Sequence, residues 1–206
     1  MEEYLALIEG GQDEIVEKKS RFIGYTAPVA SEEEAAVFIE TIRKRHYDAR
    51  HNCFAYSIGT GSQPLLRFSD DGEPQGTAGK PILEVIQGSG IRNICIVVTR
   101  YFGGTLLGTG GLVRAYTDAA KAGIAAGITR LKRQLIECEL DMEYTDLGKI
   151  QYLIGNTDAE ITDTIYTDKV LLKVRVYAPV FEKFGNEITE STGARVSVKK
   201  IGEVFD

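Results

Sequence analysis

Glycines concentrate between residues 103 and 111, directly after an apolar run and between two arginines. Gly103, Gly104 and Gly108 belong to this cluster, and Arg100 and Arg114 flank it. Glycine lets backbone N–H groups approach a ligand closely, and the start of a helix adds partial positive charge. The segment therefore predicts an anion site, for a small phosphate or for a nucleic-acid backbone.

Other residues near this segment extend the prediction. Lys80 is expected to contact phosphates together with the two arginines, and Tyr101 or Phe102 is a candidate for stacking on a base. No Gly-Lys-Ser/Thr closes the segment, and Val113 stands where a dinucleotide fingerprint needs its third glycine. These two common nucleotide motifs are thus excluded. An alternative remains open, in which the glycines only permit a tight turn from strand to helix.

An acidic turn is the second candidate for chemistry. Asp70, Asp71 and Glu73 place three carboxylates within four residues, which could bind Mg²⁺ or act as acid and base. A plain exposed polar turn has the same composition. His51 and Cys53 could be imagined as a nucleophile pair, but no third group orients them. We predict no catalytic residue, no metal site and no cofactor.

Charge is distributed unevenly along the 206 residues, whose net charge is −6. Residues 1–42 carry 10 acids and 3 bases, residues 43–133 carry 6 acids and 13 bases, and residues 134–206 carry 14 acids and 8 bases. The basic middle segment is also the glycine-rich one, and a locally positive surface can attract phosphates even on an acidic protein. These arginines could instead pair with the acidic N-terminal segment.

The location of the protein is predicted from what the sequence lacks. It has no run of 18 apolar residues and does not begin like a signal peptide, so we expect a cytoplasmic protein that does not enter a membrane. Cys53, Cys95 and Cys138 are odd in number and lie in apolar runs. They are expected to be reduced thiols in the core.

The elements that must position these residues follow from periodicity. Ser31 and Glu34 form a capping box that opens a helix, and Thr77 is expected to cap a second one. Residues 91–99 are so apolar that both faces of the predicted strand must be covered. A third helix follows the glycine cluster.

The C-terminal part has a different pattern. From residue 134, alternation and helical spacing predict the order β-α-β-β-α-β, with a last strand over residues 195–201. This order is that of a ferredoxin-like unit. The fold class is therefore α+β, with two domains at residues 1–132 and 133–206.

Four ordered motifs resemble those of the IMPACT/YigZ family. They are Ser20–Ile23, Asp48–Cys53, Phe68–Leu83 and Val97–Tyr116. The resemblance covers roughly residues 14–126, and the acidic remainder resembles the extra C-terminal domain of the bacterial members.

The resemblance implies both a fold and a set of partners. The N-terminal unit would resemble domain 2 of a small-subunit ribosomal protein and domain IV of elongation factor G, and the C-terminal unit would resemble domain V of that factor. Eukaryotic members restrain the amino-acid-starvation kinase of translational control, and they reach partners through an additional N-terminal domain. Here the motifs begin by residue 20, so that domain is not expected.

Three functions remain open at this point. We favour a non-enzymatic, translation-associated regulator that binds RNA, the ribosome or another polyanion, with translation-control proteins as further partners. The first alternative is an enzyme that acts on a phosphorylated small molecule, which requires the acidic turn to face the glycine cluster. The second is a protein-interaction module whose motif residues mainly stabilise the fold.

Overall fold

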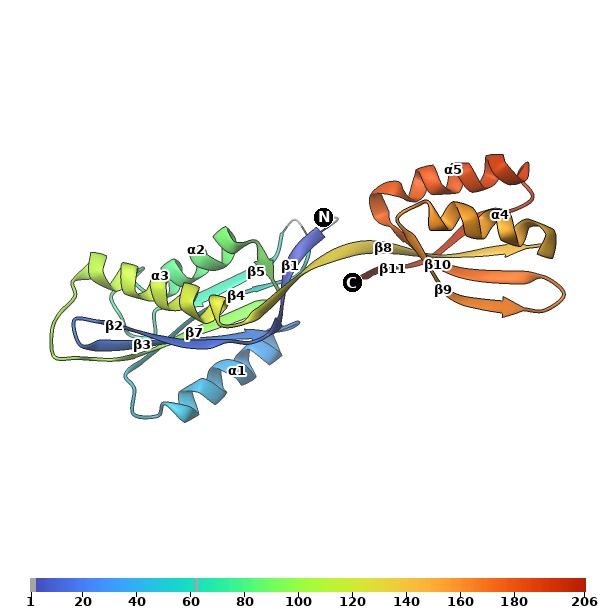
Figure 1. Cartoon of the computed structure of the whole chain (residues 1–206). Helices are drawn as coiled ribbons and strands as arrows, with labels where there is room; N and C mark the ends of the chain where they lie inside the picture. The colour runs from blue at the N-terminus through green and yellow to red at the C-terminus, as the bar shows by residue number, and fades with distance from the viewer. Residues whose placement is uncertain (1–2, 62) are drawn as a thin grey trace. The chain divides into compact units, whose positions relative to one another are not determined.

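A computed structural model describes residues 3–61 and 63–206. The chain divides into two compact units, Glu3–Leu131 and Lys132–Asp206. No helix in the described residues is long and apolar enough to cross a membrane. Both units combine helices with antiparallel sheet, as the α+β prediction required (Figure 1).

Unit 1 is built on a five-stranded sheet in the order β2-β3-β7-β4-β5. Its strands are β2 (Gln12–Glu17), β3 (Ser20–Pro28), β4 (His51–Ile58), β5 (Leu65–Ser69) and the central β7 (Ile94–Tyr101). All neighbouring pairs in this sheet are antiparallel. A short parallel pair, β1 (Glu3–Glu9) with β6 (Ile91–Arg92), completes the strands of the unit before β8.

Helices cover both faces of this sheet (Figure 1). They are α1 (Glu32–Arg45) on one face, and α2 (Gly79–Ser89) and α3 (Thr109–Ala125) on the other. Along β7, Ile96 and Val98 pack with α2 and α3, whereas Cys95 and Val97 pack with α1. Alternate side chains of a strand point to opposite faces, so the expectation that both faces of this strand are covered is met.

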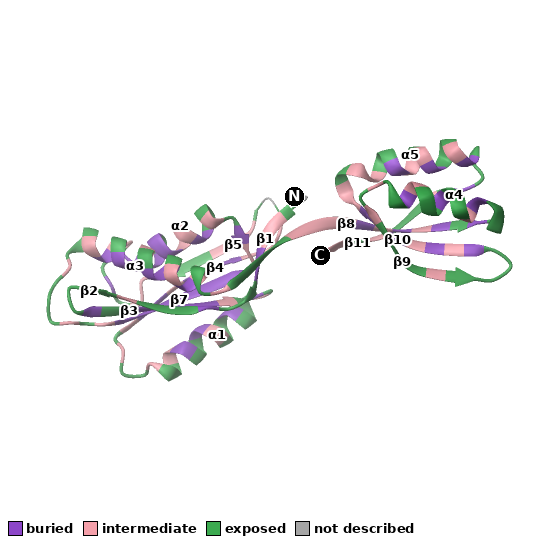
Figure 2. Cartoon of the chain, viewed as in Figure 1, coloured by how far each residue is buried: buried purple, intermediate pink, exposed green. Residues whose placement is uncertain are grey.

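Unit 2 follows the β-α-β-β-α-β order. Its elements are β8 (Ile128–Met142, which begins in unit 1), α4 (Tyr144–Gly155), β9 (Ala159–Tyr166), β10 (Val170–Tyr177), a short 3₁₀ turn (Ala178–Val180), α5 (Phe181–Thr192) and β11 (Val198–Phe205). The strands lie antiparallel in the order β11-β8-β10-β9. Ile150 of α4 and Phe184 of α5 are buried against the sheet, in a core separate from that of unit 1 (Figure 2).

The structure corrects two sequence-based expectations. The last strand covers residues 198–205 rather than 195–201. Arg195 instead precedes the strand and donates to Asp146 in the first turn of α4. Thr77 does not cap α2: the helix begins at Gly79, and the Thr77 hydroxyl donates to the Pro74 carbonyl oxygen.

Candidate functional site

The acidic turn does not form a metal site. Asp70 Oδ1 accepts hydrogen bonds from the backbone N–H groups of Ala78 at 3.1 Å and Gly79 at 2.8 Å, and Oδ2 accepts from Gly76 N at 2.8 Å. The carboxylate thus caps the start of α2 from the preceding turn, where negative charge is stabilised by the helix dipole.

The other two carboxylates point elsewhere. Asp71 accepts from Arg43 at 3.0 Å and from the backbone N–H of Asn52 at 2.7 Å. Glu73 is directed into the protein, and its side chain is 4% exposed. Within the described residues, no group of three or more His, Cys, Asp or Glu side chains could hold a metal ion. The three carboxylates adjacent in sequence are therefore separated in their contacts.

Glu73 connects the acidic turn to the segment that follows β7. Its Oε1 accepts hydrogen bonds from Arg100 Nη1 at 2.6 Å and from the Tyr116 hydroxyl at 2.8 Å. Cys53 Sγ lies 3.4 Å from the same hydroxyl, and burial raises the pKa of both the Cys53 thiol and Tyr116. A raised thiol pKa leaves little thiolate, so this arrangement does not favour Cys53 as a nucleophile.

Arg100 is a buried residue rather than an exposed phosphate ligand. It is 7% exposed, and its guanidinium carbon lies 5.4 Å from the ring centroid of Phe22. Glu73 neutralises its charge, so the prediction that Arg100 binds phosphate needs revision. Its Nε is buried and has no hydrogen-bond partner in the part of the chain that the structure describes.

The glycines of the cluster serve different purposes. A Cβ on Gly103 would lie 2.0 Å from the Lys19 carbonyl carbon, so this glycine permits close packing against the β2–β3 turn. Gly104 and Gly108 have φ values of +84° and +73°, and a Cβ on either would meet nothing within 4 Å. Gly108 precedes α3 without a side-chain cap. The open backbone therefore lies at Gly104, Gly108 and Gly110, not at Gly103.

Tyr101 is engaged in a hydrogen-bonded chain. Its hydroxyl donates to Asp48 at 2.8 Å and therefore accepts from His46 Nδ1 at 2.9 Å, which leaves His46 Nε2 to accept from the Tyr25 hydroxyl at 2.6 Å. This chain links the end of α1 to β3 and β7. Tyr101 is thereby held in place, which leaves Phe102 as the stacking candidate.

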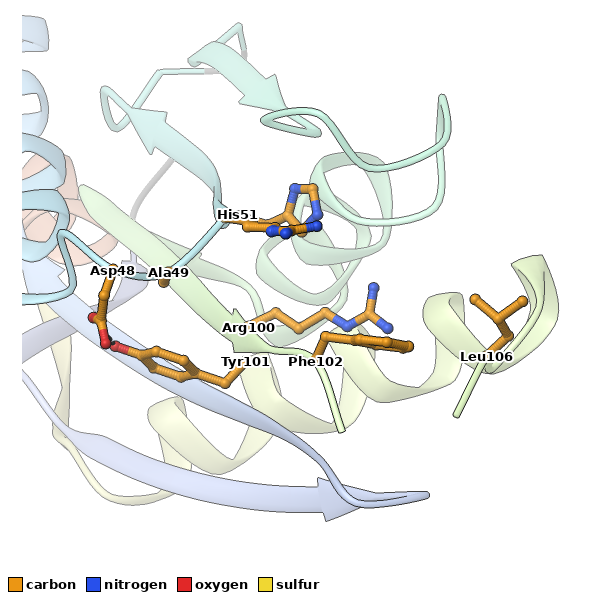
Figure 3. A pocket seen from close by; sticks show the side chains of 8 residues that line it. Asp48, Ala49, His51, Arg100, Tyr101, Phe102 and Leu106 are labelled. Carbon is orange, nitrogen blue, oxygen red and sulfur yellow. Dashed lines mark hydrogen bonds between the residues drawn. The ribbon is translucent and has the colours of Figure 1, made fainter. Parts of the chain in front are cut away.

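A pocket of about 630 Å³ lies at the ends of β4 and β7. It is lined by Asp48, Ala49, Arg50, His51, Arg100, Tyr101, Phe102 and Leu106. In Figure 3 the Arg100 guanidinium lies between His51 and Phe102. His51 Nδ1 donates to the Asp71 carbonyl oxygen at 2.9 Å, since a carbonyl can only accept. The pocket thus combines cationic groups with an aromatic ring.

Exposed cations lie near the loop between β7 and α3, residues 102–108. The side chains of Lys19, Arg50 and Arg114 are exposed, and none forms an ion pair within the described residues. The Lys19 backbone packs against Gly103, Arg50 lines the pocket with Phe102, and Arg114 follows Gly110 by one turn of α3. Lys80, by contrast, lies outside the pocket lining, with its ammonium 4.0 Å from Glu84.

Sequence analysis identified Arg114 but missed two of these cations. Arg50 is contiguous with the His51 that was considered, and Lys18-Lys19 is a basic pair in a hairpin turn, with both residues at positive φ. Only the antiparallel pairing of β3 with β7, in which Arg21 lies opposite Tyr101, brings this turn beside the glycine cluster. Nothing local in the sequence shows that proximity.

Comparisons with known proteins agree with the motifs. The Impact N-terminal domain matches residues 18–124, and a domain of unknown function (DUF1949) matches residues 140–195. IMPACT family member YvyE of Bacillus subtilis is 38% identical over 96% of this chain and 90% of its own length. IMPACT family member YigZ of Escherichia coli is 41% identical, over 90% of this chain and 92% of its own.

A solved structure agrees over both units. It is described as the crystal structure of an hypothetical protein, is 39% identical, covers 98% of each chain and has a TM-score of 0.64. The motif positions, the two matched domains and the identity over nearly the whole chain lead to one conclusion: this protein belongs to the IMPACT family.

Proposed function

We propose that this protein is a translation-associated regulator that binds RNA, free or in the ribosome. The binding surface is the loop between β7 and α3 (residues 102–108) with the cations around it. The main observation for this proposal is a set of three exposed cations near glycines with open space around their backbone. The cations are Lys19, Arg50 and Arg114, and none forms an ion pair in the described residues. Membership of the IMPACT family supports the role in translation, because resemblance to that family implies domains like those of elongation factor G.

The arrangement suits a phosphate backbone better than a catalytic centre. Lysine and arginine side chains without ion pairs attract successive phosphates. The open space at Gly104, Gly108 and Gly110 lets an anion approach the backbone N–H groups at the start of α3. An enzyme that acts on phosphorylated molecules would use Asp70, Asp71 or Glu73. None of these three residues lines the pocket, and each accepts hydrogen bonds from within the protein. The binding role is therefore favoured over the enzymatic alternative.

Salt dependence gives the first test. Binding of a fluorescein-labelled, mixed-sequence, single-stranded RNA is measured by anisotropy at 50 and 200 mM KCl. Three phosphate contacts give a logarithmic slope of about −2, so the dissociation constant should rise roughly 15-fold between these concentrations. The absence of detectable binding at 50 mM would refute the proposal.

Charge removal gives the second test. The double variant Arg50→Ala, Arg114→Ala should weaken binding at 50 mM KCl and reduce the magnitude of the salt slope by about 1.4. The matched control is Lys121→Ala, Arg130→Ala. It removes two exposed cations of unit 1 that do not line the pocket and form no ion pair among the residues that the structure describes. Equal loss of affinity in both double variants would show that the attraction is not localised at this loop.

A further inference from the structure

We propose that the pocket beside Arg100 holds one unpaired guanine base, presented either by single-stranded RNA or by a free guanine nucleotide. The RNA form of this inference rests on the proposed function and adds base preference to it. Four features of the pocket carry it: a buried arginine with an unused donor edge, the neutralisation of its charge, an exposed ring beside it, and a separate cation for phosphate.

The first feature is the hydrogen bonding of Arg100. Among the described residues, Nη1 donates to Glu73, whereas Nε is buried without a hydrogen-bond partner and Nη2 has none. Nε–H and Nη2–H lie on the same edge of the planar guanidinium, so together they form a fork with two donors. A buried donor without a partner is unfavourable. Arg100 lines the pocket, but Nε itself is sealed from solvent, so a ligand with two adjacent acceptors would satisfy this edge by displacing the atoms that cover Nε.

The second feature is charge, which distinguishes a base from a phosphate at this position. The Arg100–Glu73 pair is neutral overall and buried, since the two side chains are 8% and 4% exposed. A phosphate on the free edge of Arg100 would also be repelled by the nearby Glu73 carboxylate, and burial strengthens that repulsion. A neutral acceptor pair avoids this cost. Guanine presents O6 and N7 as two neighbouring acceptors, which match an arginine fork.

The third feature is Phe102, a residue that is 56% exposed. The Arg100 guanidinium carbon lies 5.6 Å from its centroid, over the ring (Figure 3). A base that is coplanar with the guanidinium and bonded to its edge would extend over the same ring and stack on it. Leu106, which is 82% exposed, contributes apolar surface to the same pocket.

The fourth feature is a separate cation for the phosphate, in a pocket with room for the rest of a nucleotide. The pocket volume of about 630 Å³ lies within the range that small-molecule sites occupy. Arg50 lines the pocket and is exposed without an ion pair in the described part of the chain. Arg50 would bind the phosphate, while Arg100, whose charge Glu73 neutralises, would hydrogen-bond to the base. In a duplex the base would be paired and stacked, so the site requires single-stranded RNA or a free nucleotide.

Base preference is tested with oligouridylate RNAs that carry one central guanine, adenine or 7-deazaguanine. The guanine RNA should bind at least fivefold more tightly than the adenine RNA, because one bidentate pair discriminates between bases by that amount or more. The 7-deazaguanine RNA lacks the N7 acceptor and should lose most of the preference. In parallel, GMP and AMP are titrated alone by calorimetry, and GMP should bind more tightly.

Two variants and one control link the preference to the pocket. Arg100→Lys keeps a cation for Glu73 but removes the fork, so guanine and adenine RNAs should bind equally. Phe102→Leu should weaken the guanine RNA severalfold, whereas Phe68→Leu, at an equally apolar ring on β5 that is 48% exposed, should not. Thermal unfolding verifies that each variant is folded. Phe102→Leu is informative even if Arg100→Lys destabilises the protein.

The outcomes separate this inference from the proposed function. If all three RNAs bind equally and with the expected salt dependence, the guanine pocket is refuted and the RNA-binding function stands. If GMP binds selectively but RNA does not bind, the guanine pocket stands and the RNA-binding function is refuted. If neither binds, both are refuted.

Discussion

Glu73 Oε1 and Arg100 Nη1 lie 2.6 Å apart in a buried ion pair that joins the acidic turn to the end of β7. The same carboxylate oxygen accepts a hydrogen bond from the Tyr116 hydroxyl. The Glu73 side chain thus connects β7, α3 and the turn before α2. Two motifs that look like separate sites in the sequence are thereby parts of one buried network. This network holds Arg100 in a single position at the wall of the pocket.

Glu73→Gln should destabilise unit 1 strongly. The substitution leaves the Arg100 cation buried without a counter-charge, and breaking a buried pair from one side costs about 3 kcal/mol. The measurement is the free energy of unfolding from guanidinium titration. Glu84→Gln, which breaks an exposed contact with Lys80, should cost less than about 0.5 kcal/mol. Similar costs for the two variants would contradict the burial of the pair.

Asp70→Ala should destabilise α2 by about 1–2 kcal/mol, because three backbone N–H groups lose their acceptor. Asp70→Asn keeps one side-chain oxygen as an acceptor, so it should cost less. The free energy of unfolding of both variants gives the comparison. If Asp70→Asn were as damaging as Asp70→Ala, charge rather than hydrogen bonding would be the source of the stabilisation.

Gly103→Ala and Gly110→Ala should have opposite effects. A Cβ at residue 103 would lie 2.0 Å from the Lys19 carbonyl carbon, so the β2–β3 turn would have to move, at a cost of about 3 kcal/mol. At residue 110, a Cβ meets nothing within 4 Å and the backbone is helical. There alanine should stabilise by about 0.5–1 kcal/mol. Thermal unfolding midpoints that fall for both variants would contradict the difference between these glycines.

Acidification through pH 6.5 should destabilise unit 1 because of His46. Burial, followed by the Arg45 charge, lowers the pKa of His46 below 6.5, although Asp48 acts in the opposite direction. The unfolded chain then binds more protons than the folded chain between the lowered pKa and about 6.5. Stability therefore rises with pH across this window and is constant above it.

The check is guanidinium titration from pH 5.0 to 7.5 on the wild type and on His46→Gln. The difference in unfolding free energy between the two should grow with pH up to about 6.5 and then level off. A difference that is independent of pH would show that His46 has the same pKa in both states. The comparison of the two proteins removes the pH dependence that comes from groups far from residue 46.

Much of the architecture could be predicted from local patterns. The apolar run before the glycine cluster required covered faces, and alternation with helical spacing predicted the ferredoxin-like order of unit 2. Ser31 caps α1 and accepts from the Glu34 N–H, as the capping box predicted. Each of these features depends on periodicities of 2 or 3.6 residues or on contacts three residues apart, which are visible in the sequence itself.

The chemistry of the candidate site was decided by tertiary structure. Arg100 and Glu73 are 27 residues apart, and only the packing of the acidic turn onto β7 turns an expected phosphate ligand into half of a buried ion pair. Likewise, Asp70 replaces Thr77 at the start of α2, and the pairing of β3 with β7 brings Lys19 to Gly103. The sequence alone determined which charged and glycine residues unit 1 contains. Burial and strand pairing determined which of those charges remain unpaired, because a charge is available to a ligand only where no neighbouring carboxylate reaches it.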